Sequence, residues 1–589
     1  MIEFKEKNFK FNYRRLRHLI SSGLIVSILF LANFALADSE LDGKVIRKIE
    51  MGVDPIFMND ADGLIYDLAN DLKAGTKIST IKKELLFKEG DVYDQFRVDE
   101  TMRNLRALAF LREIRLKTVV EGDYVDLYFQ VQDVWTLYPI LGFSSGGGTK
   151  NSEIGIQEGN LFGYGKRLEM RSVERDSRQN YEAVYDDIRF QDGAHRLIAA
   201  AFLPEDQSRF NLSFGRPFRN FTDEFSWQTE VESADLINFQ YKEGDEDYLY
   251  RIKRENLLSA YRIATGTPEK GVTRYSVGYG YSKADFEQAD ENDYLVADLD
   301  PNEVGNSLDR LAADRTFSGP FLGVSHVVPD FISLPYVDRF DRVEDFNLGS
   351  FIEGQVQAAP TSFGSSENAL LGSFSVGDGA RLGEREFIRG LIGFRLRNDE
   401  SGFQNKTVSF DTRYYNVLGS KELWGMPLGY HTLASSVTFD YSEELDKDRQ
   451  YNLGASDGLR GYEDFAFNGN KRVLMNFEDR FVISENIFKL VSLGGAFFAD
   501  VGTASESPFF SMFRSSLQSN VGFGFRFGIP RSSGGTVVRL DIAFPTRSYD
   551  DEKAWKPRFL VTTGMAFSGK LRSELSGIEN TNFRFGFGR

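Results

Sequence analysis

The sequence contains no cysteine. This absence excludes a lipid anchor, because there is no thiol to modify. It is also typical of an exported protein that avoids thiol chemistry in an oxidising compartment, although cysteine-free cytosolic proteins exist. On its own, the missing cysteine therefore does not decide the compartment.

Long apolar runs are also missing. Beyond residue 37 the chain has no stretch of 18 apolar residues, and a helix needs about 20 such residues to cross a bilayer. If the mature chain is embedded in a membrane, it must therefore be embedded as a closed barrel of strands, the other structure that pairs every backbone group.

Basic residues, histidine and proline are comparatively scarce. The chain has 70 Lys and Arg against 87 Asp and Glu, a net charge of −17, which disfavours nucleic-acid binding because phosphate backbones are repelled.

The histidines after residue 37 are His195, His326 and His431. They form no ligand-like cluster, so no metal or cofactor is predicted. The 55 glycines, 15 prolines and 14% aromatic residues predict an all-β body with many turns.

The first 37 residues have the parts of a secretory signal peptide. A basic stretch that includes Arg14 and Arg15 precedes an uncharged apolar run from Leu19 to Phe34, and Ala35-Leu36-Ala37 offers a small-x-small cleavage site. A single membrane anchor is the alternative, since the run approaches the length of a spanning helix. Its interruption by serine and glycine favours a cleaved signal at 1–37.

Residues 38–134 change their hydrophobic period several times, which indicates a compact mixed domain. The predicted elements are a strand at 45–53, helices at 63–72, 78–87 and 96–108, and strands at 111–119 and 124–131. The last helix is amphipathic, with apolar residues at spacings of four and three: Val98, Met102, Leu105 and Leu108. Counting the first two helical stretches as one broken element, the order is β-α-α-β-β.

From 135 to 567 the chain consists of segments of about ten residues that alternate between apolar and polar character, the spacing of a transmembrane β-barrel. A soluble β-sandwich alternates too. A sandwich rarely extends over about 430 residues without a domain break. Lipid outside and water inside explain both the alternation and the length, so the sequence predicts a barrel.

Four late segments alternate most clearly: 472–481, 520–528, 536–545 and 558–567. Asp479 is an exception, because it shares the apolar face of its segment. The charges on the opposite, inner face carry both signs and are expected to pair across a wet lumen: Glu478, Arg480, Arg526, Arg539 and Asp541.

A polar connection between Glu444 and Asn470 carries Leu459-Arg460-Gly461-Tyr462. Two segments later, Phe498 and Asp500 share one strand face, interpreted as the lumen side. If the loop folds back into the barrel, Arg460 can hydrogen-bond Asp500 and stack on Phe498. The alternative is an ordinary solvated loop arginine.

These motifs resemble the BamA-like outer-membrane assembly-factor superfamily, a POTRA domain followed by the bacterial surface antigen β-barrel, which includes the two-partner secretion transporters. Its V/L-R-G-Y/F loop and F-x-D-x-G strand match 459–462 and 498–502. Its glycine-alternating strand and its R-L-D-x-A-x-P strand match 521–526 and 539–545. Upstream, 158–165 is similar to its early-barrel turn, and its POTRA domain is similar to the segments at 86–91 and 105–111.

The resemblance implies a mainly β protein, with a transmembrane antiparallel barrel of about sixteen strands at 135–567 after one POTRA domain at 38–134. By that likeness Arg460 is the tip of an inward loop, in a motif with Leu459, Gly461 and Tyr462. Its implied lumen partners are Phe498, Asp500, Gly502, Glu478 and Arg480.

The implied function is to assist insertion and assembly of outer-membrane proteins, or to translocate polypeptides, without nucleotide or covalent chemistry. The implied partners are outer-membrane lipid, unfolded barrel proteins or a secreted polypeptide, and periplasmic accessory proteins. A client strand would add to the edge of the POTRA sheet by β-augmentation. The implied location is the bacterial outer membrane, with the N-terminal domain in the periplasm.

The chain departs from the family pattern in three respects. Only one POTRA domain fits before the barrel. The alternating segments number nearer twenty than sixteen, so some are expected to be loop hairpins. The chain also continues beyond Phe567, the expected end of the last strand, into an extension at 568–589 whose segment 582–587 alternates as well.

Other functions are weaker interpretations. Gly142 to Gly146 matches the G-x-S-x-G pattern of hydrolases, but it opens a predicted β-hairpin and lacks the strand-to-helix turn that this pattern requires. The chain is therefore predicted not to be an enzyme. Two non-enzymatic alternatives stay open: a surface-exposed structural or binding protein that displays the acidic stretch from Asp285 to Asp314, and a passive pore.

Overall fold

The computed structural model describes residues 41–563 except 58–74, 147–148, 176–177, 192, 205, 341, 489, 534–536 and 550–552. The predicted signal at 1–37, the predicted helix at 63–72 and the extension at 568–589 lie outside the described residues. In the described part of the chain, no helix has the length and apolar character needed to cross a membrane.

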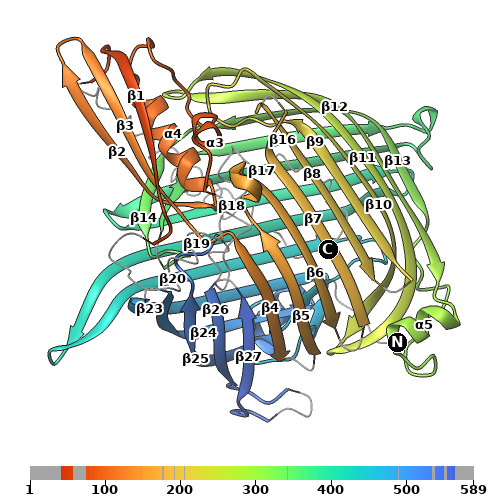
Figure 1. Ribbon diagram of the computed structural model, residues 1–589. Helices are drawn as coiled ribbons and strands as arrows, with labels where there is room; N and C mark the ends of the chain where they lie inside the picture. The colour runs from red at the N-terminus through yellow and green to blue at the C-terminus, as the bar shows by residue number, and fades with distance from the viewer. Residues whose placement is uncertain are drawn as a thin grey trace, which may run out of the picture.

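The N-terminal domain is a three-stranded sheet with helices on one face (Figure 1). Its elements are β1 (Val45–Asp54), α3 (Ile78–Lys82), α4 (Gln95–Ala107), β2 (Leu111–Glu121) and β3 (Tyr124–Asp133). The strand order is β1-β3-β2, with β1 parallel and β2 antiparallel to β3. Val98 and Leu105 of α4 pack into the core against Ile46 and Leu127, as the amphipathic spacing of α4 requires.

The helix predicted at 78–87 is shorter in the structure, because α3 ends at Lys82. The residues that follow pack without helical structure. Phe87 is buried in the core, and the backbone N–H of Leu86 donates to the hydroxyl of Thr101 on α4 at 3.2 Å. Apolar periodicity alone did not show where this helix stops.

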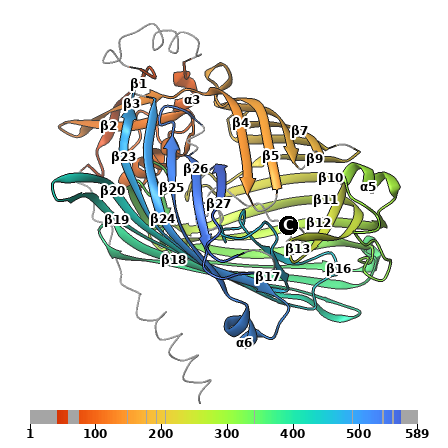
Figure 2. The same ribbon diagram turned by 90° about the horizontal axis from the view of Figure 1, so that it is seen from below.

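The rest of the described chain is dominated by one antiparallel sheet of twenty strands. Its strand order returns from β27 to β4, and Figures 1 and 2 show these two strands beside each other. The strands are β4 (Leu137–Gly146), β5 (Thr149–Glu158), β6 (Lys166–Arg175), β7 (Arg178–Phe190), β8 (His195–Pro204), β9 (Ser208–Arg216), β10 (Phe225–Lys242), β11 (Asp245–Thr267), β12 (Gly271–Gln288), β13 (Arg315–Val327), β16 (Phe351–Ala359), β17 (Ala369–Gly383), β18 (Glu386–Asp399), β19 (Gly402–Leu423), β20 (Met426–Glu443), β23 (Lys471–Ile487), β24 (Val491–Ser505), β25 (Gln518–Gly528), β26 (Val537–Pro545) and β27 (Arg558–Thr563).

The prediction of about sixteen strands is wrong, because the large sheet has twenty strands in the described part of the chain. That number came from the resemblance, whereas the alternating segments themselves indicated nearer twenty. Two hairpins do lie outside the large sheet: β14 (Phe331–Pro335) with β15 (Val343–Asn347), and β21 (Tyr451–Leu453) with β22 (Phe467–Gly469).

The two faces of the sheet differ as a membrane barrel requires. On β25, Val521, Phe523 and Phe525 are 40–53% exposed on the outer face, whereas Arg526 on the inner face is fully buried. This arrangement, with apolar side chains outside and charged side chains inside, is the reverse of the arrangement in a water-soluble protein. The alternation that predicted the barrel is therefore a property of its two faces.

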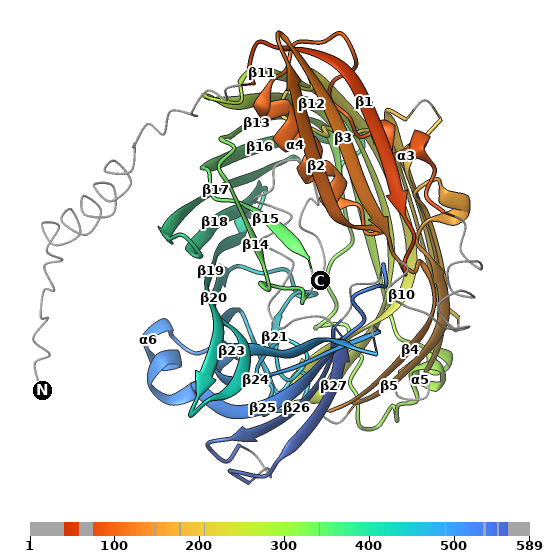
Figure 3. The same ribbon diagram turned by 60° about the vertical axis from the view of Figure 1, so that its left-hand side comes forward.

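Both small hairpins lie inside the ring of strands (Figure 3). The hairpin β14–β15 packs on the inner wall through Phe346, which contacts Phe387 and Tyr415 with ring centroids 5.0 and 6.0 Å apart. The pair β21–β22 belongs to the connection 444–470 and forms a buried cluster with Leu474 of β23. The interior is therefore occupied by two inserted segments.

Short helices occur in the connections, where no helix was predicted. They are α5 (Glu291–Ala297) and α6 (Phe509–Ser511), with single turns at Leu161–Gly163, Thr361–Phe363 and Met512–Ser516. The α5 helix starts at a capping box, in which Asp290 and Asp293 each accept the other's backbone N–H. The local cap explains this helix within the acidic stretch 285–314.

A glycine-rich turn at 158–165 attaches the N-terminal domain to the barrel. The carbonyl of Gly163 accepts from the backbone N–H of Lys77 at 3.0 Å and from the hydroxyl of Thr80 at 2.9 Å. Gly163 has φ +81°, and a Cβ there would lie 2.3 Å from the carbonyl oxygen of Gly75. Only glycine allows this approach.

Helix α4 is fixed to the barrel by charged contacts. Arg106 donates twice, at 2.8 Å each, to Asp345 on β15. Glu100 is fully buried and accepts from the backbone N–H of Phe221 at 2.8 Å. Glu84, after α3, accepts from both Nε and Nη2 of Arg189 on β7. The domain is therefore docked on one end of the barrel by paired charges.

The docked domain should respond to pH through Glu100. Burial raises the pKa of this carboxyl to about 7, although the Phe221 N–H, Arg103 and Arg274 act in the opposite direction and Asp223 adds to the rise. In an undocked domain the pKa would return towards 4.5. Between these values the undocked state binds fewer protons, so docking should weaken as pH rises from about 5 to 7.

Hydrogen exchange of the α4 amides at pH 5 and pH 7.5, corrected for intrinsic rates, would measure this effect. Glu100→Gln, which stays neutral and keeps an acceptor for the Phe221 N–H, should keep α4 protected at both values. Asp99→Asn, an exposed neighbour on the same helix, is the control and should behave like the parent chain. Equal protection of the parent chain at both pH values would contradict the prediction.

Candidate functional site

The connection 444–470 folds into the barrel and carries Arg460 at its inner tip. Leu459 is fully buried in a cluster with Leu453 and Phe467, which holds the loop against the wall. Gly458 has φ +111°, and a Cβ on Gly461 would lie 2.5 Å from the Cβ of Asn520. The glycines that frame Arg460 are thus required by backbone conformation and by close packing.

Arg460 lies between two buried carboxylates. Its Nε and Nη2 donate to Asp500 at 2.8 and 2.7 Å, and its Nη1 donates to Glu478 at 2.5 Å. The guanidinium carbon lies 3.6 Å from the ring centroid of Phe498. Both contacts that the sequence analysis assigned to Arg460, with Asp500 and with Phe498, are present in the structure.

Two asparagines that the sequence analysis did not assign to the site hold Asp500 in place. Asn476 on β23 donates to Asp500 and to the carbonyl of Gly458, both at 2.7 Å. Asn520 on β25 donates to Asp500 at 2.7 Å and accepts from the Gly461 N–H at 3.0 Å. The inward face of the strands was the available signal, but it did not single out these amides.

Glu478 extends the network to the second inserted segment. Its other oxygen accepts from Arg480 Nε at 2.7 Å, and Arg480 Nη1 donates to the carbonyl of Val337 at 2.8 Å and to Asp338 at 3.1 Å. Val337 and Asp338 follow β14. Glu478 and Arg480 therefore join the loop around Arg460 to the inner hairpin.

The charges of β25 and β26 complete the cluster. Arg526 donates to Asp541 at 2.5 Å, and Arg539 lies 3.6 Å from the same carboxylate. The oppositely charged residues pair as predicted, but the expectation of a wet lumen is wrong for this cluster. Glu478, Asp500 and Arg526 have no exposed surface, because the loop 444–470 covers them.

The glycine alternation of β25 makes room for this cluster. A Cβ on Gly522 would lie 2.3 Å from the ring of Phe498, and a Cβ on Gly524 would lie 2.1 Å from the carboxylate of Asp541. At Gly502, on β24, a Cβ would lie 2.7 Å from the carbonyl of Val473. These glycines therefore belong to the packing of the loop against the wall.

The remaining motif residue, Tyr462, fixes the outer side of the loop. Its hydroxyl donates to the side-chain oxygen of Gln518 at 3.2 Å and to the carbonyl of Ser519 at 3.1 Å.

On the outer face of the barrel, Asp479, the exception to the apolar pattern, lies 2.9 Å from His431 Nδ1. A polar partner on the neighbouring strand thus accounts for that exception.

The network binds protein segments to one another. Within the described residues, no three His, Cys, Asp or Glu side chains are grouped as metal ligands would be. Gly142 to Gly146 lies in β4, which is paired with β5 as a hairpin, without the strand-to-helix turn of a hydrolase. What this arrangement does chemically is to hold a loop inside a barrel.

Solved structures with a similar fold cover most of the chain. BamA from Haemophilus ducreyi lacking POTRA domains 1–3 matches at 14% identity and TM-score 0.35, over 88% of this chain and 84% of that one. CdiB from Acinetobacter baumannii matches at 13% and 0.43, over 93% and 97%. CdiB from Escherichia coli matches at 10% and 0.45, over 93% and 84%.

No protein-family model and no curated protein sequence matches the chain.

Replacing Arg460 should destabilise the barrel. Arg460→Ala removes the cationic partner of the buried Asp500 carboxylate and leaves Glu478 with Arg480 as its hydrogen-bonded partner. Leaving a buried carboxylate such as Asp500 without its cation typically costs about 3–5 kcal/mol. We expect the folded form to convert to the slower-migrating unfolded form at a lower temperature in a heat-modifiability gel. Lys447→Ala, an exposed residue of the same connection, is the matched control and should leave this temperature unchanged. Equal heat resistance of both variants would contradict the role given to Arg460.

Proposed function

We propose that this chain is a BamA-like outer-membrane protein that assists the insertion of other barrel proteins or translocates polypeptides. The observation that carries the proposal is the loop 444–470, which is held inside the barrel through Arg460, Asp500 and Glu478. A loop held by paired charges in a membrane barrel can stabilise the closed state and still be released, because each contact is non-covalent.

The proposed placement follows from the two ends of the molecule. The outer face of the barrel is apolar and suits lipid, and residues 1–37 would direct export. The N-terminal domain lies at one end of the barrel, and α5 lies at the opposite end (Figure 1). We place the N-terminal domain in the periplasm, as the single POTRA domain, and α5 outside the cell.

A client would be captured at the edge of the N-terminal sheet. The order β1-β3-β2 leaves β2 at one edge, and β2 becomes progressively more exposed towards Glu121. A strand with an unpaired edge can accept an extended segment by main-chain hydrogen bonds. This mode of binding needs no cofactor and no catalytic residue, and the proposed function is accordingly not enzymatic.

The passive pore is a poorer explanation of the structure. A barrel of 16–18 strands typically leaves an aqueous channel, but here the loop 444–470 and the hairpin β14–β15 both lie within the ring (Figure 3). A pore for steady diffusion has no use for two inserted segments joined through Glu478 and Arg480.

Depletion of this protein should lower the amounts of the outer-membrane or secreted proteins that depend on it. The measurement is a quantitative census of outer-membrane and secreted proteins before and after depletion, with restoration by the parent gene. Arg460→Ala should restore less than Lys447→Ala at equal protein level. Unchanged amounts of all these proteins after depletion would refute an assembly or transport function.

A second function is favoured by one observation, the folded connection that contains α5. Arg251 of β11 donates to Asp293 of this helix at 2.5 Å and to Asp235 at 2.7 Å, and Tyr248 donates to the carbonyl of Ser307 at 2.9 Å. A connection that is built and tethered in this way suits a binding surface outside the cell. A surface-binding protein is therefore the alternative function.

Protease treatment of intact cells would test where this connection lies. We expect cleavage within 285–314, while the N-terminal domain is cleaved only after the outer membrane is opened. Cleavage of the N-terminal domain in intact cells would reverse the proposed orientation.

A further inference from the structure

A cationic cavity lies where the N-terminal domain meets the outside of the barrel. It has a volume of about 130 Å³, and four of its lining residues are Lys83, Arg189, Arg216 and Arg219. A site of about 10–15 Å³ already holds one water molecule, so this cavity has room for a larger polar group. Four cations around one cavity favour an anionic ligand.

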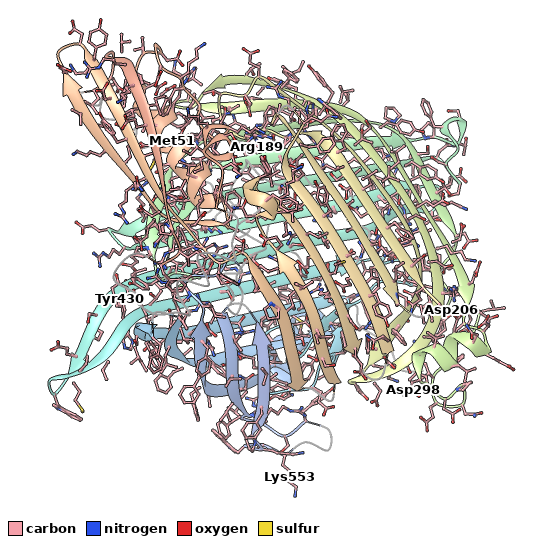
Figure 4. The ribbon with its side chains drawn as sticks, in the orientation of Figure 1. Met51, Arg189, Asp206, Asp298, Tyr430 and Lys553 are labelled. Carbon is pink, nitrogen blue, oxygen red and sulfur yellow. The ribbon has the colours of Figure 1, made fainter. Side chains whose placement is uncertain are left out.

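Two of these cations, Arg189 and Arg219, make hydrogen bonds to other groups of the protein. Arg189 pairs with Glu84 and donates to the carbonyl of Gly193 at 3.2 Å. Arg219 donates to the carbonyls of Gly193 and Ile188, which are neutral and do not cancel its charge. Burial lowers the pKa of Arg219 to about 10, so the side chain stays cationic at neutral pH. Figure 4 shows Arg189 at this junction.

The other two cations are available to a ligand. No hydrogen bond or ion pair of the Lys83 or Arg216 side chain is found among the described residues. Arg216 instead lies over the ring of Phe225, 4.1 Å from its centroid. The acid in the lining, Asp223, is engaged by the backbone N–H of Arg219 at 2.7 Å and the side chain of Asn220 at 3.0 Å. These neutral donors do not cancel the charge of Asp223, so it offsets one of the four cations, and Glu84 offsets another. The cavity therefore keeps an excess of positive charge.

The position of Arg216 indicates where the ligand comes from. On β9 it follows Leu212 and Phe214 at spacings of two, so it lies on the outer face of the barrel, where Leu212 is 49% exposed. Its partner across the ladder is Trp227, which stacks edge-on with Phe214 at 5.2 Å. Aromatic side chains of this kind mark the level of lipid headgroups.

We propose that this cavity binds the phosphate group of an anionic phospholipid from the leaflet that meets the N-terminal domain. Lys83 and Arg216 would contact the phosphate oxygens, with Arg189 and Arg219 behind them, while the acyl chains lie along the apolar face of β9 and β10. Basic pockets at the membrane surface bind lipid headgroups in this way. The inference rests on the proposed function for the membrane and for the identity of the leaflet.

A bound lipid would also join the two parts of the protein. Lys83 follows α3 of the N-terminal domain, whereas Arg216 ends a strand of the barrel wall. A phosphate held by both would add a contact across the docking interface that Glu84 and Arg189 already form. The lipid would therefore stabilise the docked position of the N-terminal domain.

Native mass spectrometry of the purified full chain in neutral detergent, with added dioleoyl phosphatidylglycerol, would test the site. We expect the parent chain to retain one lipid, and the Lys83→Gln/Arg216→Gln variant to retain it at least roughly tenfold more weakly, because two cations near the headgroup are lost. The matched control is Lys82→Gln/Arg209→Gln. It removes the same number of charges, from the last residue of α3 and from β9, but neither residue lines the cavity, and it should retain lipid like the parent chain.

Equal retention of lipid by both double variants, with both folded by the heat-modifiability gel, would overturn the proposal. Inorganic phosphate alone serves as the second probe. If phosphate displaces the lipid at equal concentration, the site recognises a free anion and the lipid proposal is overturned. The result is read from lipid on the purified chain, so it is independent of whether depletion changes the census of outer-membrane proteins.

Discussion

The structure depends on one buried guanidinium. Taking Arg460 and its carboxylate partners out of water costs several kcal/mol per ion, and only close, well-oriented pairing offsets that cost. Asp500 receives two hydrogen bonds from Arg460 and one from each of two asparagines, so its oxygens are fully used. Such a cluster tolerates few displacements. It therefore determines how the loop, β23, β24 and β25 lie relative to one another.

The same requirement explains features that seem unrelated along the chain. Gly522 and Gly524 leave the space that Phe498 and Asp541 occupy, and Gly461 allows the loop to approach Asn520 closely. A slip of one residue in these strands would turn the charged side chains towards lipid. The alternation of the late strands and the composition of the loop are thus parts of one packing problem.

The sequence alone predicted the barrel, the N-terminal strands, helix α4 and the contacts of Arg460 with Phe498 and Asp500. These follow from short periodic patterns and from motifs a few residues long. It did not predict that Asn476 and Asn520 hold Asp500, that Asp338 pairs with Arg480, or where α3 ends, because these depend on contacts between distant segments. The strand number was wrong because it was taken from a resemblance and not from the segments. The lumen charges were expected in water because the sequence positioned only Arg460 at the tip of the loop, and not the rest of 444–470 that covers them.

Because two segments fill the inside of the ring, the barrel can have a large circumference without being permeable. The twenty strands among the described residues enclose a width that, left empty, would let small solutes equilibrate across a membrane. With β14–β15 filling the interior from one side and β21–β22 from the other, the wall can be long without becoming a leak. A long wall offers more lipid-facing perimeter and more room for rearrangement between strands. The chain thus has the dimensions of a large channel while its interior is packed like that of a globular domain.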